Sequence, residues 1–278
     1  MRIELLDTGY FYADGGAMFG AIPKTAWRRR YPVNDTNGCV LAMRSVLAAT
    51  GEGRIILIDN GVGNKCLEQF GYYNFFDLID LNDALNKRGV SPGQITDVVL
   101  THLHFDHCGY TTYKDRRSGE LRLSFPYATH WVSQKQWDNC LQPNPLEKDS
   151  LLIDNIYPVA DAGRLRLIDE DTRLCREINL RLYDGHTPGQ IVPYIQTPER
   201  TVVFAGDVIP LAASVSPHWI SAYDTFPVTS YYEKVRLLEE AAGEQQAVIY
   251  GHDAYTPCSG IKKINGFYKA GSKIEFTR

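Results

Sequence analysis

The sequence predicts a mixed α/β fold with many short strands and fewer helices. Short runs of aliphatic and β-branched residues recur between Gly, Pro, Asp and Asn, and a few segments repeat leucine at helical spacing. Several apolar runs also finish in His or Asp, as strands that lead into a functional site do. The 278 residues, 44% of them hydrophobic, can build one large core, and no repeat or Ser/Pro-rich linker divides them. We therefore expect a single domain over residues 1–278.

Nine segments have the composition of strands. Each is rich in Val, Ile or Leu and is bounded by residues that favour turns. The predicted strands are 2–6, 39–47, 54–59, 97–101, 128–132, 178–183, 191–196, 201–205 and 247–250.

Three segments are predicted to be helical. Three leucines share one face of the first: Leu78, Leu81 and Leu85. This helix should stop at Gly89, because glycine commonly ends helices. A second helix is expected to begin near Ser230, whose hydroxyl would cap it while Glu233 reaches back three residues later. The third is expected at residues 133–141.

The charge balance and hydropathy exclude several classes of protein. The net charge is −4 at pH 7, and no basic run exceeds the triplet at 28–30, which argues against a long nucleic-acid track or a polybasic membrane anchor. No apolar run approaches the roughly 18 residues that a membrane span needs. The first residues include Glu4 and lack the apolar stretch of a secretory signal, so we expect a cytoplasmic location.

The six cysteines do not form a recognisable framework. They lie at 39, 66, 108, 140, 175 and 258, and no two are spaced as a CxxC pair. This pattern favours neither a zinc ribbon nor a disulfide scaffold, so we expect free, partly buried thiols. Cys108 is the one candidate for another role, because it directly follows a cluster of histidines.

That cluster is THLHFDHCG at 101–109, which contains three of the seven histidines within six residues. In an extended segment His102 and His104 point to the same side and can bind one ion. Asp106 and His107 follow where the chain turns and can face a second ion. Three crowded imidazoles repel one another when protonated, unless a cation keeps them neutral. The spacing therefore predicts a metal site.

Other potential ligands or their supports also stand at the ends of apolar runs. Five runs finish in such a residue: Asp59, His102, His186, Asp207 and His252. Loops that follow strands share one rim of an α/β sheet, so these distant segments can build a single site. His130 and His218 stand alone, and we expect them to be ordinary core or surface histidines.

The segment HLHFDH at 102–107 resembles the HxHxDH motif of the metallo-β-lactamase superfamily. Further landmarks of that family follow in the expected order around it: LIDNG at 57–61, GHTPG at 185–189, GDVIP at 206–210 and YGH at 250–252. The segment GGAMFGAIPKTAW at 15–27 resembles a subgroup with lactonase-like and organophosphate-hydrolase-like members. The resemblance implies a four-layer αββα sandwich of two mixed β-sheets flanked by helices.

The resemblance also implies a dinuclear metal site. One metal would be held by His102, His104 and His186, and the other by Asp106, His107 and His252. Asp207 would bridge the two, and Asp59 would orient a ligand histidine. Histidine with carboxylate suits Zn²⁺, which we expect, although Mn or Fe would accept the same ligands.

The expected activity is hydrolysis of an ester-like bond in a small molecule, with a lactone as the favoured substrate. Two metals ~3.5–4 Å apart can hold a bridging hydroxide as the nucleophile. Asp106 would orient this nucleophile and later pass a proton to the leaving group. Several lactonases of the family carry a tyrosine three residues after the bridging aspartate, where this chain has Pro210, so Tyr223 is the candidate to polarise the carbonyl.

Alternative activities stay open at this point. A phosphotriester or thioester hydrolase would use the same site, and a persulfide dioxygenase would use overlapping ligands with one iron. A true β-lactamase is disfavoured by Asp207, a hydroxyacylglutathione hydrolase by the short chain after His252, and a nuclease by the charge balance. A non-enzymatic binding protein is disfavoured because all seven ligands are present.

Aromatic residues gather in the apparent loops. The aromatic residues are Phe19, Trp27, Phe70, Tyr72, Tyr73, Phe75, Phe76, Trp219 and Phe226, and Met18 lies beside the first of them. Either they pack in the core or in a subunit interface, or they form an apolar wall for an acyl or aryl group. The first reading makes a homodimer reasonable, and the second implies a small-molecule substrate.

Overall fold

The computed structural model of the chain describes residues 1–115 and 117–276. Within them the strands form two large mixed sheets and one small hairpin. The chain clusters into two compact units, each with one large sheet. Unit 1 consists of Met1–Tyr10 and Met43–Glu170, and unit 2 of Phe11–Ala42 and the residues from Asp171 onward. The prediction of a single domain stays a prediction.

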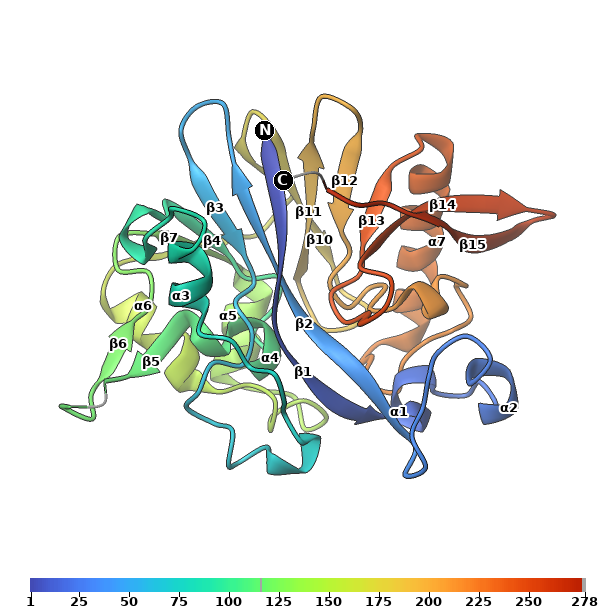
Figure 1. Ribbon diagram of the computed structural model, residues 1–278, viewed down its shortest axis with the longest axis horizontal. Helices are drawn as coiled ribbons and strands as arrows, with labels where there is room; N and C mark the ends of the chain where they lie inside the picture. The colour runs from blue at the N-terminus through green and yellow to red at the C-terminus, as the bar shows by residue number, and fades with distance from the viewer. Residues whose placement is uncertain (116, 277–278) are drawn as a thin grey trace. The chain divides into compact units, whose positions relative to one another are not determined.

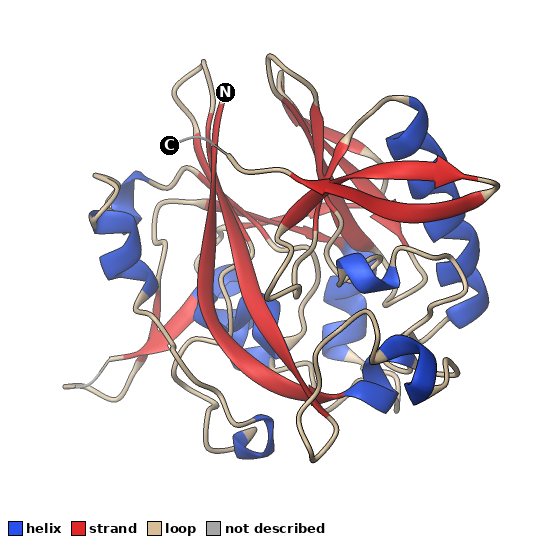
Figure 2. Cartoon of the chain, turned by 45° about the vertical axis from the view of Figure 1, so that its right-hand side comes forward, coloured by secondary structure: helices blue, strands red, loops and turns tan. Residues whose placement is uncertain are grey.

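The sheet of unit 1 has the order β1-β2-β3-β4-β7-β8. Its strands are β1 (Arg2–Asp14), β2 (Gly38–Ala49), β3 (Ile55–Ile58), β4 (Asp97–Val99), β7 (Thr129–Ser133) and β8 (Leu165–Ile168). Figure 2 shows β1 and β2 as two long neighbouring strands. The last four strands run parallel to one another, so the segments that follow β3 and β4 leave the sheet at the same edge.

Short helices and one hairpin complete unit 1. They are α3 (Leu81–Asn86), α4 (Phe105–Cys108), α5 (Gln134–Leu141) and α6 (Tyr157–Asp161), the 3₁₀ turns η1 (Gly71–Tyr73), η2 (Pro92–Gln94), η3 (Gly109–Thr111) and η4 (Ile153–Asn155), and the pair β5 (Thr112–Lys114) and β6 (Leu121–Leu123). Helix α5 packs against β7 and β8 (Figure 1).

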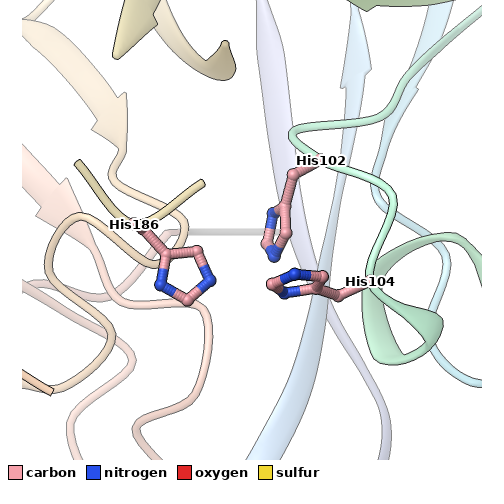
Figure 3. A group of neighbouring side chains, drawn as sticks. All are labelled: His102, His104 and His186. Carbon is pink, nitrogen blue, oxygen red and sulfur yellow. The ribbon is translucent and has the colours of Figure 1, made fainter. Parts of the chain in front are cut away.

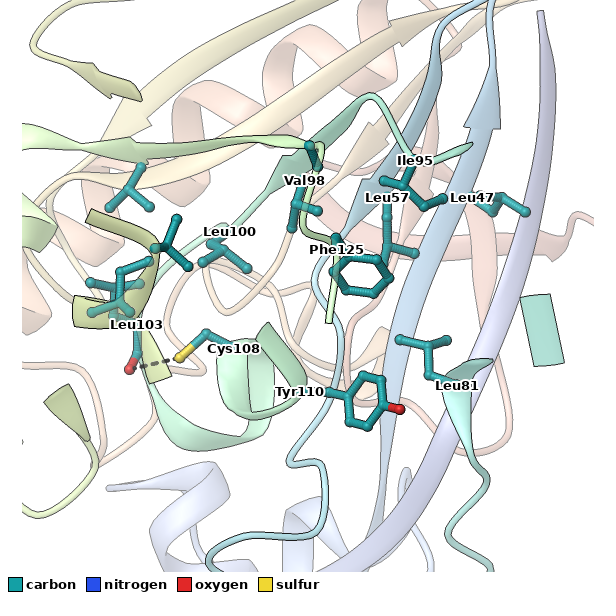
Figure 4. Packing of buried hydrophobic residues seen from close by; sticks show 14 of the residues in the cluster. Leu47, Leu57, Leu81, Ile95, Val98, Leu100, Leu103, Cys108, Tyr110 and Phe125 are labelled. Atoms are coloured by element: carbon teal, nitrogen blue, oxygen red, sulfur yellow. Dashed lines mark hydrogen bonds between the residues drawn. The ribbon is translucent and has the colours of Figure 1, made fainter. Parts of the chain in front are cut away.

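Buried side chains from β3, β4 and the loops after them form the core of unit 1 (Figure 4). Leu57, Val98 and Phe125 are completely buried in it. Cys108 belongs to the same cluster, and its thiol donates a hydrogen bond to the carbonyl of Leu103 at 3.3 Å. Burial raises the pKa of this thiol well above its usual range. Cys108 is therefore an inert core residue, and none of the six cysteines, all of which lie in the described part of the chain, forms a disulfide.

The sheet of unit 2 has the order β15-β14-β13-β12-β11-β10-β9. Its strands are β9 (Thr172–Cys175), β10 (Ile178–Tyr183), β11 (Gln190–Gln196), β12 (Thr201–Phe204), β13 (Ala247–Ile249), β14 (Cys258–Ile264) and β15 (Phe267–Lys273). The helices are α1 (Gly15–Phe19), α2 (Lys24–Trp27), η5 (Ala212–Ser214) and α7 (Pro227–Gly243), of which α7 lies against β14 (Figure 1). Because β12 and β13 are parallel, the segments that follow them also share one edge.

All nine predicted strands are present, with ends that differ by a few residues except at β1, which is much longer. Six strands were not predicted: β5, β6, β8, β9, β14 and β15. Five of these, all except β14, lie at sheet edges, where a strand is partly exposed to water and its sequence lacks a continuous apolar run. The strands of the β14–β15 hairpin, which Figure 2 shows at the edge of the sheet of unit 2, contain four lysines.

The helix predictions were right about existence and wrong about two starts. Helix α3 begins at Leu81, after its cap Asp80, and ends at Asn86, so the predicted Leu78 lies outside it. Helix α5 begins after Ser133, whose hydroxyl accepts a hydrogen bond from the amide of Gln136. The predicted cap at Ser230 is wrong, because α7 begins at Pro227 and Ser230 is buried inside it. The carboxylate of Glu233 instead binds two amides of a distant loop. No helix in the described part of the chain has the length and apolar character to cross a bilayer.

His130 is the expected core histidine, and it makes the stability of the fold depend on pH. It is fully buried in β7, and burial lowers its pKa to about 4 from an ordinary value of 6.5. Between these values the unfolded chain binds a proton that the folded chain does not. Stability should therefore fall as the pH drops from about 6.5 to about 4. Urea titrations at about pH 7 and about pH 4.5 measure this effect. Between these two pH values the free energy of unfolding of the wild type should fall by about 2–3 kcal/mol more than that of His130→Gln. Equal losses would contradict this assignment.

Candidate metal centre

Three imidazoles lie against one another in unit 1. The chain leaves β4 at Val99, and His104 has extended backbone angles immediately before α4. The ring centroids of His102 and His104 are 4.5 Å apart in an edge-to-face arrangement, which Figure 3 shows, and those of His102 and His107 are 4.0 Å apart. All three side chains are buried. Protonated rings would repel at these distances, so the cluster favours neutral imidazoles.

Asp59 fixes two of these histidines. This buried residue follows β3 with a left-handed φ of 55°, and its carboxylate accepts hydrogen bonds from the amide and hydroxyl of Thr101, both at 2.8 Å. It also contacts Nδ1 of His107 at 2.8 Å. The hydroxyl of Thr101 is 3.0 Å from Nδ1 of His102. Because this hydroxyl donates to Asp59, it accepts from His102, and Nε2 of both histidines keeps the lone pair that a metal needs. Burial raises the pKa of Asp59, and its hydrogen bonds act in the opposite direction.

His104 is held from its other side. Its Nε2 lies 2.8 Å from Oε2 of Glu147, a carboxylate that is also buried. The proton therefore belongs on Nε2, and Nδ1 becomes the nitrogen available to a metal. Sequence reasoning missed Glu147, because nothing in the motif marks a carboxylate 43 residues further along the chain.

Unit 2 brings together the other predicted ligands. His186 follows β10, Asp207 follows β12 and His252 follows β13. Oδ2 of Asp207 lies 3.4 Å from Nε2 of His186, and Oδ1 lies 3.1 Å from Nε2 of His252. One carboxylate thus faces two imidazole nitrogens, an arrangement that suits a shared metal ligand.

The outer nitrogens of these two histidines are also engaged. Nδ1 of His186 contacts Oδ1 of Asp224 at 2.9 Å, and Nδ1 of His252 donates to the carbonyl of Ala42 at 2.8 Å. Both contacts place the proton on Nδ1, so Nε2, on the side of Asp207, carries the lone pair that could bind a metal. Asp224 was also missed in the sequence, since it lies 38 residues from His186 in an unremarkable loop.

Helix α7 and the segment before it anchor the loop that carries His186. The carboxylate of Glu233 accepts hydrogen bonds from the amides of Asp184 and Gly185, each at 2.8 Å. The amide of Thr225 donates to the carbonyl of His186 at 2.9 Å. A Cβ at Gly185 would lie 2.5 Å from Cα of Ser230, so only glycine allows this close approach.

The remaining predicted residues are less constrained. Asp106 lies in α4 with Oδ2 3.7 Å from Nε2 of His107. Tyr223 lies in the loop that also carries Asp224, and its side chain is 41% exposed. The carbonyl of Pro210 accepts a hydrogen bond from the amide of His252 at 3.1 Å, so this residue supports the backbone of a predicted ligand.

The side-chain chemistry of each unit fits divalent transition metals. Imidazole nitrogens and carboxylate oxygens, which both units carry, are ligands of the kind that zinc, manganese and iron accept. A model of the metallo-beta-lactamase superfamily matches residues 43–252, which are most of the chain and include all seven predicted ligands. The chain belongs to this superfamily.

Solved structures of metallo-beta-lactamase type cover almost the whole chain. A probable metal-dependent hydrolase from Staphylococcus aureus is 27% identical, with a TM-score of 0.86 over 99% of this chain and 98% of that one. Hydrolase AbOPH is 22% identical, with a TM-score of 0.81 over 99% and 95%. AidC, a dizinc quorum-quenching lactonase with a bound product, is 22% identical, with a TM-score of 0.76 over 99% and 95%.

One curated relative is much longer than this chain. Cleavage and polyadenylation specificity factor subunit 3-II from Arabidopsis thaliana is 22% identical over 174 residues, which are 59% of this chain and 26% of that protein. The chain thus spans about a quarter of this relative.

The superfamily match and the structural likeness confirm the predicted fold class of mixed sheets with flanking helices. They also support the prediction of an enzyme.

Proposed function

We propose that this chain is a dinuclear-metal hydrolase that cleaves an ester-like bond of a small molecule, with lactones as the first substrate class. The observation that carries the proposal is tautomer control. Each of the five histidines has one ring nitrogen held by an oxygen acceptor, so the other nitrogen is kept as a lone-pair donor. Histidines that merely fill a core have no need for five such arrangements.

The proposed ligand sets follow the motifs of the sequence. One cation would be held by His102, His104 and His186, the other by Asp106, His107 and His252, and Asp207 would serve as a ligand to each. The donor set favours zinc. Bound there, two divalent cations supply Lewis acidity and a water that is acidic enough to ionise near neutral pH.

The residues of the chain would orient and protonate the reactants. Asp106 has a partly accessible carboxylate beside His107, where it can align the attacking water and return a proton to the leaving alkoxide. Asp59 and Asp224 keep their histidines in a fixed orientation, so little reorganisation is needed during the reaction. Tyr223 is a candidate hydrogen-bond donor to the substrate carbonyl.

An aromatic cluster next to the histidine motif, in which Phe70 and Phe105 are buried and Tyr73 is partly exposed, favours an acyl substrate. Phe105 stands between His104 and Asp106 in the sequence and stacks on Phe70 with ring centroids 4.0 Å apart. Tyr73 lies 5.5 Å from the same ring. Such a wall suits an apolar chain. AidC, which shares the fold, binds the product of a homoserine lactone.

The aromatic residues of unit 2 follow the packing interpretation instead. Phe19 stacks on Trp27 at 4.9 Å and meets Trp219 edge to face at 5.8 Å, and all three are buried. We assign them to the core of unit 2.

Metal removal tests the proposed function. The purified protein should contain two divalent cations per chain, and a strong chelator should abolish hydrolysis, which added Zn²⁺ restores. The substrate class is then identified by assaying lactones, thioesters, phosphotriesters and β-lactams with protein of measured metal content. The class that is hydrolysed rapidly shows which type of bond the protein cleaves. His218→Ala, which changes an exposed histidine, is the control and should retain both metal and turnover. Full hydrolytic activity after chelation would contradict the proposal. A protein that contains one iron per chain and oxidises a thiol substrate with oxygen would also contradict it.

A further inference from the structure

Glu147 is a buried charge on an otherwise accessible loop. All its neighbours in residues 142–150 are exposed or partly exposed, whereas the Glu147 side chain is 4% exposed. Burial of a carboxylate is unfavourable unless hydrogen bonds compensate for lost water. Burying the carboxylate of Glu147 therefore costs free energy of folding. We look for a functional role that explains this burial.

Both oxygens of Glu147 are occupied in a defined way. Oε2 contacts Nε2 of His104 at 2.8 Å. Oε1 accepts hydrogen bonds from the side-chain amides of Asn139, at 2.7 Å, and of Asn144. Because the two asparagines saturate one oxygen, the other is left pointing at the imidazole. The asparagines therefore set the direction of the carboxylate.

The same region also holds the backbone around His104. The side-chain carbonyl of Gln136, in α5, accepts a hydrogen bond from the amide of Leu103 at 2.9 Å. The amide of Phe105 donates to the carbonyl of Ser150 at 2.9 Å. Residues 136–150 thus restrain the main chain on both sides of His104 as well as its ring.

His104 differs from the other four histidines in which nitrogen faces outward. His102, His107, His186 and His252 each engage Nδ1 with the outer acceptor, and His104 engages Nε2. Nε2 is at the far tip of the ring, so its acceptor must come from a segment beyond the motif. A loop that returns after α5 meets this geometric requirement.

We infer that Glu147 is a positioning residue, which holds His104 as the Nε2–H tautomer so that Nδ1 is its metal donor. The inference rests on the proposed function, because it names the orientation of one of the proposed ligands. A nearby carboxylate also makes the imidazole a stronger donor. Glu147 should therefore control the affinity of the cation that uses His104 and affect the other cation much less.

Two variants of Glu147 and one control test this role. Glu147→Ala removes the acceptor, and Glu147→Gln keeps the shape and removes the charge, so it remains informative if the alanine variant does not fold. Leu146→Ala is the control, because the neighbouring leucine is 81% exposed. Competition with a chromophoric zinc chelator should show one of two zinc equivalents weakened about 10–100-fold in Glu147→Ala and to a smaller extent in Glu147→Gln. Leu146→Ala should bind zinc as the wild type does.

A second measurement reads the tautomer without metal. Long-range ¹H–¹⁵N spectra of the imidazoles in the metal-free full-length protein should show His104 protonated at Nε2 in the wild type and a mixture of tautomers in Glu147→Ala. Unchanged tautomer and unchanged zinc affinity in both Glu147 variants would overturn the inference while leaving the proposed function intact. A wild type that binds no zinc would overturn the proposed function and the inference with it, and the wild-type titration reveals this before any variant is compared.

Discussion

Replacing Asp207 with asparagine is expected to abolish metal binding and turnover together, each by at least about a hundredfold, since losing even an outer hydrogen-bond partner of a metal ligand costs 10–100-fold. The two oxygens of Asp207 face Nε2 of His186 and Nε2 of His252. In the proposed centre Asp207 would be a ligand to each cation. An amide has one oxygen donor and no negative charge, so it cannot offset the repulsion between two adjacent cations. Metal content and kcat/KM should be measured on the same preparation.

The matched control is Asp161→Asn, which removes an exposed carboxylate on α6 and should change neither quantity. Loss of turnover in Asp207→Asn with both metals still bound would contradict the ligand role. Asp207 would then act as a base or a proton carrier.

Replacing Gly109 with alanine is expected to destabilise the fold by about 3 kcal/mol or more. Gly109 directly follows α4 and has ordinary helical angles, with φ of −61°, so the effect does not come from backbone strain. A Cβ there would lie closer than 3.0 Å to three backbone atoms of Val62, which cannot rotate away as a side chain could. The clash should separate the segment after β3 from the helix that carries Asp106 and His107. Urea unfolding of the metal-free protein measures the loss.

Gly71→Ala is the control for this substitution. An added Cβ at Gly71 meets no atom within 4 Å, so this variant should unfold at nearly the wild-type urea concentration. If Gly109→Ala proved as stable as Gly71→Ala, the tight contact between α4 and residue 62 would not exist in solution.

The ligands and the residues that orient them come from different parts of the chain. The ligand motifs are local, whereas Glu147 and Asp224 lie on loops that have no sequence signature. Substitutions in these loops should therefore alter metal affinity while every ligand stays in place. The histidine motif of this superfamily therefore identifies the candidate ligands, but it does not identify the carboxylates that fix the tautomer of each ligand histidine.

The sequence predicted the central strands well and the sheet edges poorly. β10 and β12 have continuous apolar or alternating runs because their neighbours on both sides bury them, and both were predicted within one residue. β9 and β15 lie at the edges of their sheet and carry Arg, Lys and Gly, so no periodicity marks them. The start of α7 was misplaced because Ser230 and Glu233 resemble a capping box, while the helix begins at Pro227 and Glu233 binds a distant loop.

By itself the sequence determined the kind of chemistry, because the identity and spacing of His102, His104, Asp106 and His107 are local properties of one short segment. Tertiary structure decided which nitrogen of each ring is held by an oxygen acceptor. That choice depends on acceptors 38 to 48 residues away for His186, His104 and His107, and 210 residues away for His252. Such partners meet only after the chain has folded, since no local periodicity encodes a contact over that separation.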